Sequence, residues 1–149
     1  TFYTHFAKII MSFETPLGFF DGFVFDKDKE HKDQIDIKKG GTFILVQGIR
    51  SLSLEHKIYR ANTIRRIKEL NEIGVLNDEL SSELIESFNF LNTLKLKSQL
   101  EKLDAGKEVD NYICPKSLTS MEKDLLKDSF KIINKLKKKL EDRYKLNYV

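Results

Sequence analysis

The stretch AGKEVDNYICPKSLTSMEKDLL, residues 105–126, lies between two long segments that have the residue pattern of helices. Gly106 is a typical helix end, because glycine takes the left-handed conformation at little cost. Pro115 cannot continue a helix. Thr119 and Glu122 have the T-x-x-E spacing of a capping box, which predicts that the next helix begins there. The stretch therefore predicts the turn of a hairpin made of two long helices.

Both arms of this helical hairpin are amphipathic. The first begins at Asn77 or Asp78, ends near Leu103, and repeats apolar residues at intervals of three and four, namely Leu80, Leu84, Phe88 and Leu91. The second begins at Thr119 and is expected to turn its lysines outward and an apolar stripe inward: Met121, Leu125, Ile132, Leu136, Leu140 and Tyr144. Each stripe predicts one buried face per helix.

Three shorter helices are predicted before the hairpin. The first covers residues 1–13 and ends before a proline, which excludes the residue preceding it from the helical region. The second is FILVQGIRSLSLEH, residues 43–56, and a pair of glycines at 40–41 separates it from the segment before it. The third is NTIRRIKELNEIG, residues 62–74, with Gly74 as its C-cap.

A short β-hairpin is predicted between the first two helices. Residues 16–25, PLGFFDGFVF, are rich in aromatic and β-branched residues, and residues 34–38, QIDIK, alternate apolar and polar side chains around a charged turn. A two-stranded hairpin is marginal alone, so it is expected to lie on the helices. The predicted fold class is therefore mainly α: a bundle of four to five helices with a small N-terminal β-hairpin.

Composition restricts the class of protein. A chain of 149 residues suits one domain, and a net charge of +3 is too small to favour nucleic acid as a partner. The single cysteine, Cys114, excludes an internal disulfide. No apolar run approaches the roughly 18 residues of a membrane span, so a cytoplasmic protein without a membrane partner is expected. The chain begins at Thr1 rather than Met, which indicates a piece of a longer polypeptide.

The last helix carries many lysines, but they do not have the pattern of a nucleic-acid surface. No aromatic residue lies among them to stack on bases, and two acidic residues interrupt them. A solvated face is the favoured interpretation for these lysines: Lys131, Lys135, Lys137, Lys138 and Lys139.

Patterns of catalytic or metal chemistry are weak. Asp26 and Asp28 resemble a carboxylate pair for Mg²⁺, but a solvated charged turn is favoured, and no metal or cofactor is expected in this chain. Neither a G-x-x-x-x-G-K phosphate loop nor a G-x-S-x-G elbow is present. Arg50 and His56 have a spacing that resembles the ribonuclease motif of HEPN domains. The favoured alternative is structural: Arg50 pairs with a carboxylate and His56 ends a helix.

Several segments, taken in order, resemble the family of nucleotidyltransferase substrate-binding domains. Their order and spacing agree with the family pattern from Pro16 to near the end of the chain. The matching positions are Pro16–Phe20, Ile35–Lys38, Arg50 with Ser53 and Leu54, Thr63 with Arg66 and Ile67, Gly74–Leu76, Leu94–Gln99, and Gly106 through Asp110 and Asn111 to Pro115 and Leu118. Two departures are a serine at position 53, where alanine is usual, and lysines at 95 and 97, where arginine is common.

The resemblance implies a place in a larger enzyme. Such domains follow a nucleotidyltransferase core in bacterial signal-transduction proteins, often with cyclic-nucleotide-binding and CBS domains upstream. The core holds Mg²⁺ and a nucleoside triphosphate with a D-x-D pair after a Gly-Ser turn, and this chain contains no Gly-Ser dipeptide. The resemblance therefore implies a domain without catalytic residues that presents a protein or small-molecule acceptor, similar to the helical region of PII uridylyltransferases. Residues 1–15 are expected to be the linker helix from the core, and residues 16–149 the substrate-binding domain.

Six residues are candidates for substrate binding. Lys38, Arg50, Arg66 and Gln99 are expected to line a polar cleft, where lysine and arginine suit phosphate oxygens, with salt bridges between elements as the alternative. Asp110 and Asn111 match a family motif, and a structural turn is favoured over contact with substrate. Two other functions stay open: a ribonuclease that uses Arg50 and His56, and a scaffold or homodimerisation module.

Overall fold

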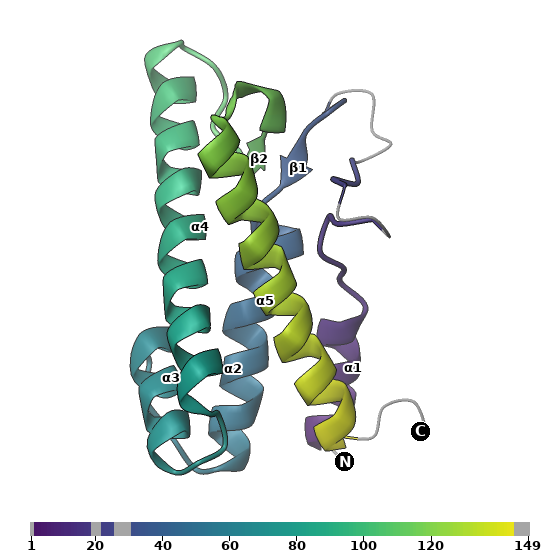
Figure 1. Ribbon diagram of the computed structural model, residues 1–149, viewed down its shortest axis with the longest axis vertical. Helices are drawn as coiled ribbons and strands as arrows, with labels where there is room; N and C mark the ends of the chain where they lie inside the picture. Colours follow the sequence, from purple (N-terminus) through teal and green to yellow (C-terminus); the bar gives the residue numbers. More distant parts are fainter. Residues whose placement is uncertain (1, 19–21, 26–30, 145–149) are drawn as a thin grey trace.

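The computed structural model describes residues 2–18, 22–25 and 31–144. Figure 1 shows a helical bundle with one small sheet at its upper end. The elements are α1 (Phe2–Met11), β1 (Ile35–Asp36), a π-helical turn η1 (Lys38–Thr42), α2 (Phe43–Glu55), α3 (Thr63–Glu72), α4 (Asp78–Asp104), β2 (Tyr112–Ile113), a 3-10 turn η2 (Pro115–Ser117) and α5 (Ser120–Tyr144). The predicted fold class, a mainly α bundle with a small two-stranded antiparallel sheet, is confirmed.

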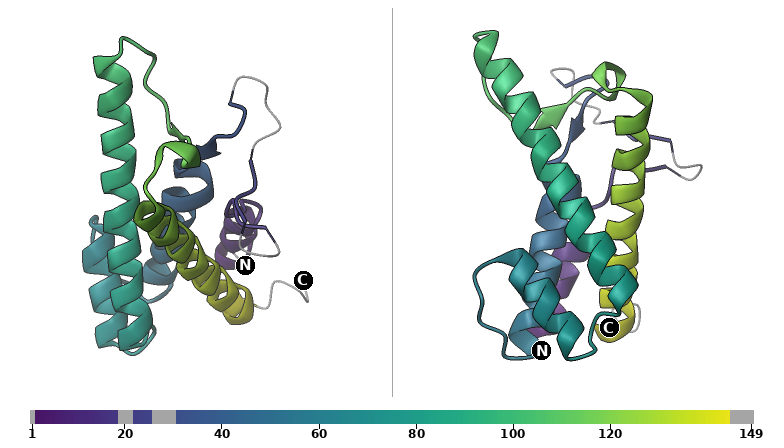
Figure 2. Two further views of the ribbon diagram at one scale, coloured as in Figure 1. Left: turned by 45° about the horizontal axis from the view of Figure 1, so that its top comes forward. Right: turned by 60° about the vertical axis from the view of Figure 1, so that its left-hand side comes forward.

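Helix α2 lies at the centre of the bundle and contacts α1, α3 and α5. The long helices α4 and α5 pack on one another and form the predicted helical hairpin (Figures 1 and 2). Aliphatic side chains and one phenylalanine fill the space between these helices; the fully buried ones include Ile44, Leu45, Ile49, Leu52, Leu84, Leu91, Phe130, Ile133 and Leu136. Among the described helices, none is long and apolar enough to cross a membrane.

The predicted helix ends are confirmed where their signals are local. The side chain of Asn77 accepts a hydrogen bond from the backbone N–H of Leu80 at 2.7 Å, so Asn77 is the N-cap of α4. Gly74 and Gly106 follow α3 and α4 with φ of +79° and +69°. These values lie in the left-handed region, which explains why glycine occupies both positions.

The buried face of α5 agrees with the predicted stripe at Ile132, Leu136 and Leu140 and differs from it at the start of the helix. There Leu126 and Phe130 are buried, and neither was predicted. Met121 and Leu125 consequently fall at its edge and are 74% and 44% exposed. The prediction that both point inward is wrong, because the spacing at the start of α5 permits two adjacent stripes and the packing selects the later one.

The small sheet forms between partners that differ from the predicted ones. Ile35 pairs with Ile113 and Asp36 with Tyr112, so β1 pairs with the connector after α4 and not with residues 16–25. Residues 16–18 instead lie beside residues 22–24 through an isolated antiparallel bridge between Leu17 and Phe23. The observed pairing buries both Ile35 and Ile113 against the bundle. Residues 26–30, with the Asp26 and Asp28 pair, lie outside the described residues.

The capping box of α5 provides a first test of the fold. The Thr119 N–H donates to Glu122 Oε1 at 2.9 Å, and the Glu122 N–H donates to Thr119 Oγ1 at 3.1 Å, as predicted. Replacing Thr119 by alanine removes one of these bonds, and we expect the free energy of unfolding to fall by about 1 kcal/mol. Urea denaturation measures this change. Thr119→Ser retains the hydroxyl and should unfold at nearly the parent midpoint.

Candidate functional site

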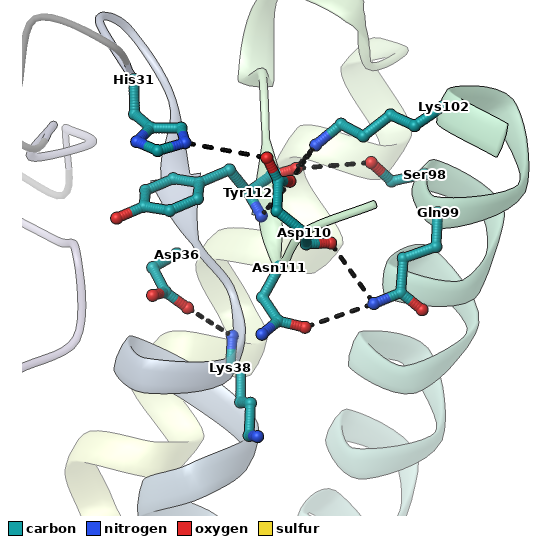
Figure 3. Close-up of polar contacts among 9 residues, drawn as sticks. All are labelled: His31, Asp36, Lys38, Ser98, Gln99, Lys102, Asp110, Asn111 and Tyr112. Carbon is teal, nitrogen blue, oxygen red and sulfur yellow. Dashed lines mark hydrogen bonds and ion pairs between the residues drawn. The ribbon is translucent and has the colours of Figure 1, made fainter. Parts of the chain in front are cut away.

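The connector between α4 and α5 is organised around the carboxylate of Asp110. Its Oδ1 atom accepts hydrogen bonds from the ammonium of Lys102 and from the backbone N–H of Tyr112, the latter at 3.0 Å. The ring of His31 stacks on that of Tyr112, with centroids 3.6 Å apart, and its Nε2 lies 3.7 Å from Asp110 Oδ2. Figure 3 shows these side chains converging from three segments of the chain. Asp110 therefore joins α4 to the sheet.

The ionisation of Asp110 gives a pH test of this arrangement. Partial burial raises the pKa of the Asp110 carboxyl, but the hydrogen bonds from Lys102 and the Tyr112 N–H, with the nearby charges of Lys102 and His31, outweigh it and lower the pKa. A lowered pKa means that the stabilisation is complete above the ordinary value of about 3.9 and is lost as the pH falls through the folded value.

We therefore expect parent and Asp110→Asn chains to differ most in free energy of unfolding at neutral pH. The difference should be constant down to about pH 5 and shrink below about pH 4, because only the parent carboxylate can be protonated. Urea unfolding at pH 7, 5, 4 and 3 measures it. A difference that stays constant to pH 3 would show that the ionised Asp110 contributes nothing.

Asn111 is held by a side chain from α4. Gln99 Nε2 donates to Asn111 Oδ1 at 3.2 Å and to the backbone oxygen of Asp110 at 3.3 Å. The backbone oxygen of Asn111 accepts the N–H of Ile37 at 2.9 Å and extends the β1–β2 pairing. Because the amide oxygen faces Gln99, the amide nitrogen is turned to the side where Lys38 and Asp36 lie (Figure 3).

Asp36 begins the helical segment that carries Lys38. Its Oδ1 accepts the backbone N–H groups of Lys38 and Lys39 at 3.1 and 2.8 Å. The helical backbone consequently starts at Lys38 and runs through η1 into α2, so the prediction that glycines 40–41 separate α2 from the preceding segment is wrong. Both glycines are buried, and their small size lets η1 pack closely on its neighbours.

A small hollow opens beside these residues, which we call the Lys38–Lys39 hollow. It has a volume of about 180 Å³ and is lined by Phe13, Asp36, Lys38, Lys39, Phe43 and Asn111. A second hollow of about 270 Å³ adjoins it and shares Phe13, Asp36 and Lys39 with it. Lys39 and Phe13 were not predicted as site residues. The sequence QIDIKK, residues 34–39, has a second lysine directly after Lys38, and this could have indicated Lys39. No sequence pattern indicated Phe13.

Four of the six predicted residues thus gather at one place. Lys38 and Asn111 line the hollow, and Gln99 and Asp110 hold Asn111 and the connector in position. Arg50 and Arg66 lie near one another, at the contact of α2 with α3. Arg66 Nε donates to the backbone oxygen of Arg60, and its pKa is lowered by burial and by the charge of Arg50.

Comparison with known protein families identifies one family model that matches the chain. The family model described as "Putative nucleotidyltransferase substrate binding domain" matches residues 1–144. The chain belongs to this family. Comparison with curated proteins and with solved structures found no match. The match covers all five helices, so the Lys38–Lys39 hollow and the arginine pair are both parts of a nucleotidyltransferase substrate-binding domain.

Within this substrate-binding domain, Arg50 and His56 interact with different neighbours. His56 Nδ1 lies 2.9 Å from the backbone oxygen of Leu52, and its Nε2 lies 3.4 Å from Arg143 of α5. The positive charge of Arg50 lies close to that of Arg66, and no ion pair between Arg50 and a carboxylate is found among residues 2–18, 22–25 and 31–144, so the expected pairing of Arg50 is not observed. His56 thus ends α2, as the structural alternative has it, and the described contacts give no observation that favours the ribonuclease interpretation.

Metal ligands are not clustered in the described part of the domain. Among residues 2–18, 22–25 and 31–144, no three His, Cys, Asp or Glu side chains are arranged to hold an ion. Two lysines and one asparagine belong to the lining of the hollow, and their ammonium groups and amide NH₂ can donate hydrogen bonds. These groups can bind and orient a ligand.

Proposed function

We propose that this domain binds the acceptor of a nucleotidyl transfer reaction and presents it to a catalytic core that precedes it in the same polypeptide. The family supports the reaction class, since its members are described as substrate-binding domains of nucleotidyltransferases. The observation that supports the proposal is the Lys38–Lys39 hollow, whose lining combines lysines of η1 with Asn111 of the connector.

In this proposal the catalytic core and the substrate-binding domain have different roles. Transfer of a nucleotide needs carboxylates that hold Mg²⁺ on the triphosphate, and in this proposal the core supplies them. The domain contributes positioning: its residues keep the acceptor in one orientation, which lowers the entropic part of the barrier. We further propose a cytoplasmic bacterial signalling protein of the PII-uridylyltransferase type, in which α1 joins the core to residues 16–149.

The proposal predicts a sharp contrast between two proteins. Residues 1–149 alone, supplied with Mg²⁺ and each of the four nucleoside triphosphates, should release no pyrophosphate above the level of a protein-free control. The polypeptide expressed from its complete gene should label an acceptor in extracts of its own cells when given α-³²P-labelled triphosphates. Transfer catalysed by residues 1–149 alone would contradict the proposal, and so would a complete polypeptide of only about 17 kDa.

A further inference from the structure

We propose that the Lys38–Lys39 hollow recognises the oxyanion of a small acidic molecule, a phosphomonoester or a carboxylate, and that the apolar part of this molecule lies against Phe13 and Phe43. This inference rests on the proposed function and names the chemical class of its acceptor. It concerns binding by this domain alone, so it can be tested without the catalytic core.

The first argument concerns the partners of the donor groups in the lining, within the part of the chain that the structure describes. Neither Lys38 nor Lys39 forms an ion pair with any carboxylate of the described residues, and the NH₂ of Asn111 forms no hydrogen bond there. The ammonium of Lys39 lies 6.0 Å from the centroid of the Phe13 ring. Both lysines are exposed, and an anion bound beside them and the Asn111 amide can accept charge-assisted hydrogen bonds from these groups.

The other charged groups of the hollow leave it positive. Asp36 is the acidic residue in its lining, and Asp36 Oδ1 already accepts two backbone N–H groups. These N–H groups belong to the first turn of η1, so that turn offers them to Asp36 and not to a ligand. Glu14 lines only the adjoining hollow and is close to the charge of Lys137. The lining therefore contains two cationic side chains and one carboxylate that is already hydrogen-bonded, which favours an anionic ligand.

Gln99 determines which way the amide of Asn111 faces. Rotating that amide by 180° would place its NH₂ against the NH₂ of Gln99, donor against donor. The pairing with Gln99 disfavours this orientation and turns the NH₂ toward the side of Asp36 and Lys38, two other residues of the lining (Figure 3). We therefore assign Gln99 a positioning role and Asn111 direct contact with the ligand.

The remaining wall is aromatic and suits the apolar part of the ligand. The rings of Phe13 and Phe43 meet edge to face with centroids 4.8 Å apart. At about 180 Å³ the hollow holds only a small group, and the adjoining hollow of about 270 Å³ gives further room beside Phe13. Each is smaller than the roughly 300 Å³ at which pockets for small molecules begin, and the two share Phe13, Asp36 and Lys39. A compact acid with one ring fits this space.

The test is a titration of the ¹⁵N-labelled domain, followed by NMR, with four probes. Phenyl phosphate and benzoate carry a ring and an oxyanion, inorganic phosphate carries only the oxyanion, and benzyl alcohol only the ring. We expect saturable shifts of the Lys38 and Lys39 amides and of the Asn111 side-chain NH₂ with at least one of the first two. Inorganic phosphate should bind about tenfold more weakly, and benzyl alcohol should cause no shift. The ratio of phenyl phosphate to benzoate affinity distinguishes phosphate from carboxylate recognition.

Variants locate the site. Lys38→Gln and Lys39→Gln should each weaken binding about tenfold, the loss of one charge-assisted hydrogen bond. Asn111→Asp keeps the acceptor for Gln99 and replaces the donor by a negative oxygen, so it should abolish binding. Gln99→Leu should move the Asn111 NH₂ resonances of the free protein and weaken binding several-fold. Lys68→Gln removes the same charge from the exposed face of α3 and should leave the affinity unchanged.

Two outcomes would overturn the inference: no saturable shift with phenyl phosphate or benzoate, or an equal loss of affinity in Lys68→Gln, which would indicate unspecific attraction. Either outcome leaves the proposed function to be judged by the transfer experiment. Conversely, anion binding by the domain with no transfer by the complete polypeptide would keep the site and remove the proposed reaction.

Discussion

Replacing Phe130 by alanine is expected to lower the free energy of unfolding by about 3–5 kcal/mol. Phe130 has the largest side chain among the fully buried residues. Its ring lies where α5 meets η1 and α4, since a Cβ built on Gly41 would be 3.3 Å from Phe130 Cε1 and 3.5 Å from Leu91 Cδ1. Alanine would leave a cavity between α5, η1 and α4. These elements are held by their other contacts and cannot move together to fill it. Domains of this size are stable by only about 5–15 kcal/mol, so much of the stability would be lost.

Urea unfolding monitored by circular dichroism measures this effect. Phe130→Leu fills most of the cavity and should recover more than half of the loss. Phe2→Ala is the matched control, because Phe2 is 66% exposed and its removal should change the free energy of unfolding by no more than about 0.5 kcal/mol. If Phe130→Ala and Phe2→Ala lowered the free energy of unfolding by equally small amounts, Phe130 would not be packed between α5 and η1.

Replacing Gly40 by alanine is expected to destabilise the domain by about 1–3 kcal/mol through one added methyl group. A Cβ at this position would lie 2.8 Å from Pro16 Cδ and 3.2 Å from the backbone oxygen of Glu14. Neither a proline ring nor a carbonyl group can rotate away, so η1 and the segment around Pro16 must separate. Both line the adjoining hollow, and binding of phenyl phosphate should weaken together with the stability.

Gly22→Ala is the control for this substitution. A Cβ at Gly22 would meet no atom within 4 Å, and the residue is exposed. This variant should be neutral, or more stable by about 0.4–1 kcal/mol, because alanine reduces the freedom of the unfolded chain. Equal unfolding midpoints for Gly40→Ala and Gly22→Ala would show that η1 does not pack closely on residues 14–16.

The features of the fold predicted correctly are those whose physical cause is local. The capping box of Thr119 and Glu122 acts over three residues, and so does the N-cap at Asn77. Gly106 ends α4 because of its own backbone conformation. Nearby residues of the same short segment determine each of these signals, so pattern and spacing suffice to find them.

The pairing of β1 could not be predicted in this way. Two alternating isoleucines identify an extended segment but contain no information about its partner. Residues 16–25 were nearest along the chain, whereas Tyr112–Ile113 becomes the partner once α4 has brought the connector back across the bundle. Which stripe of α5 is buried is decided similarly, by contact with α4 and η1.

The candidate site also has features that the sequence predicts and features that depend on packing. The sequence by itself determined that Lys38, Gln99, Asp110 and Asn111 were residues to consider, that the chain is a mainly helical domain, and which family it resembles. Only the tertiary structure decided that these four residues gather while Arg50 and Arg66 form a separate pair. It also added Lys39 and Phe13 to the site and fixed the direction of the Asn111 amide. The physical reason is that β1 and η1 meet the connector through the bond from the Ile37 N–H to the Asn111 oxygen, 74 positions apart in the chain (111 − 37). Such a contact is set by the packing of the bundle and not by local propensity.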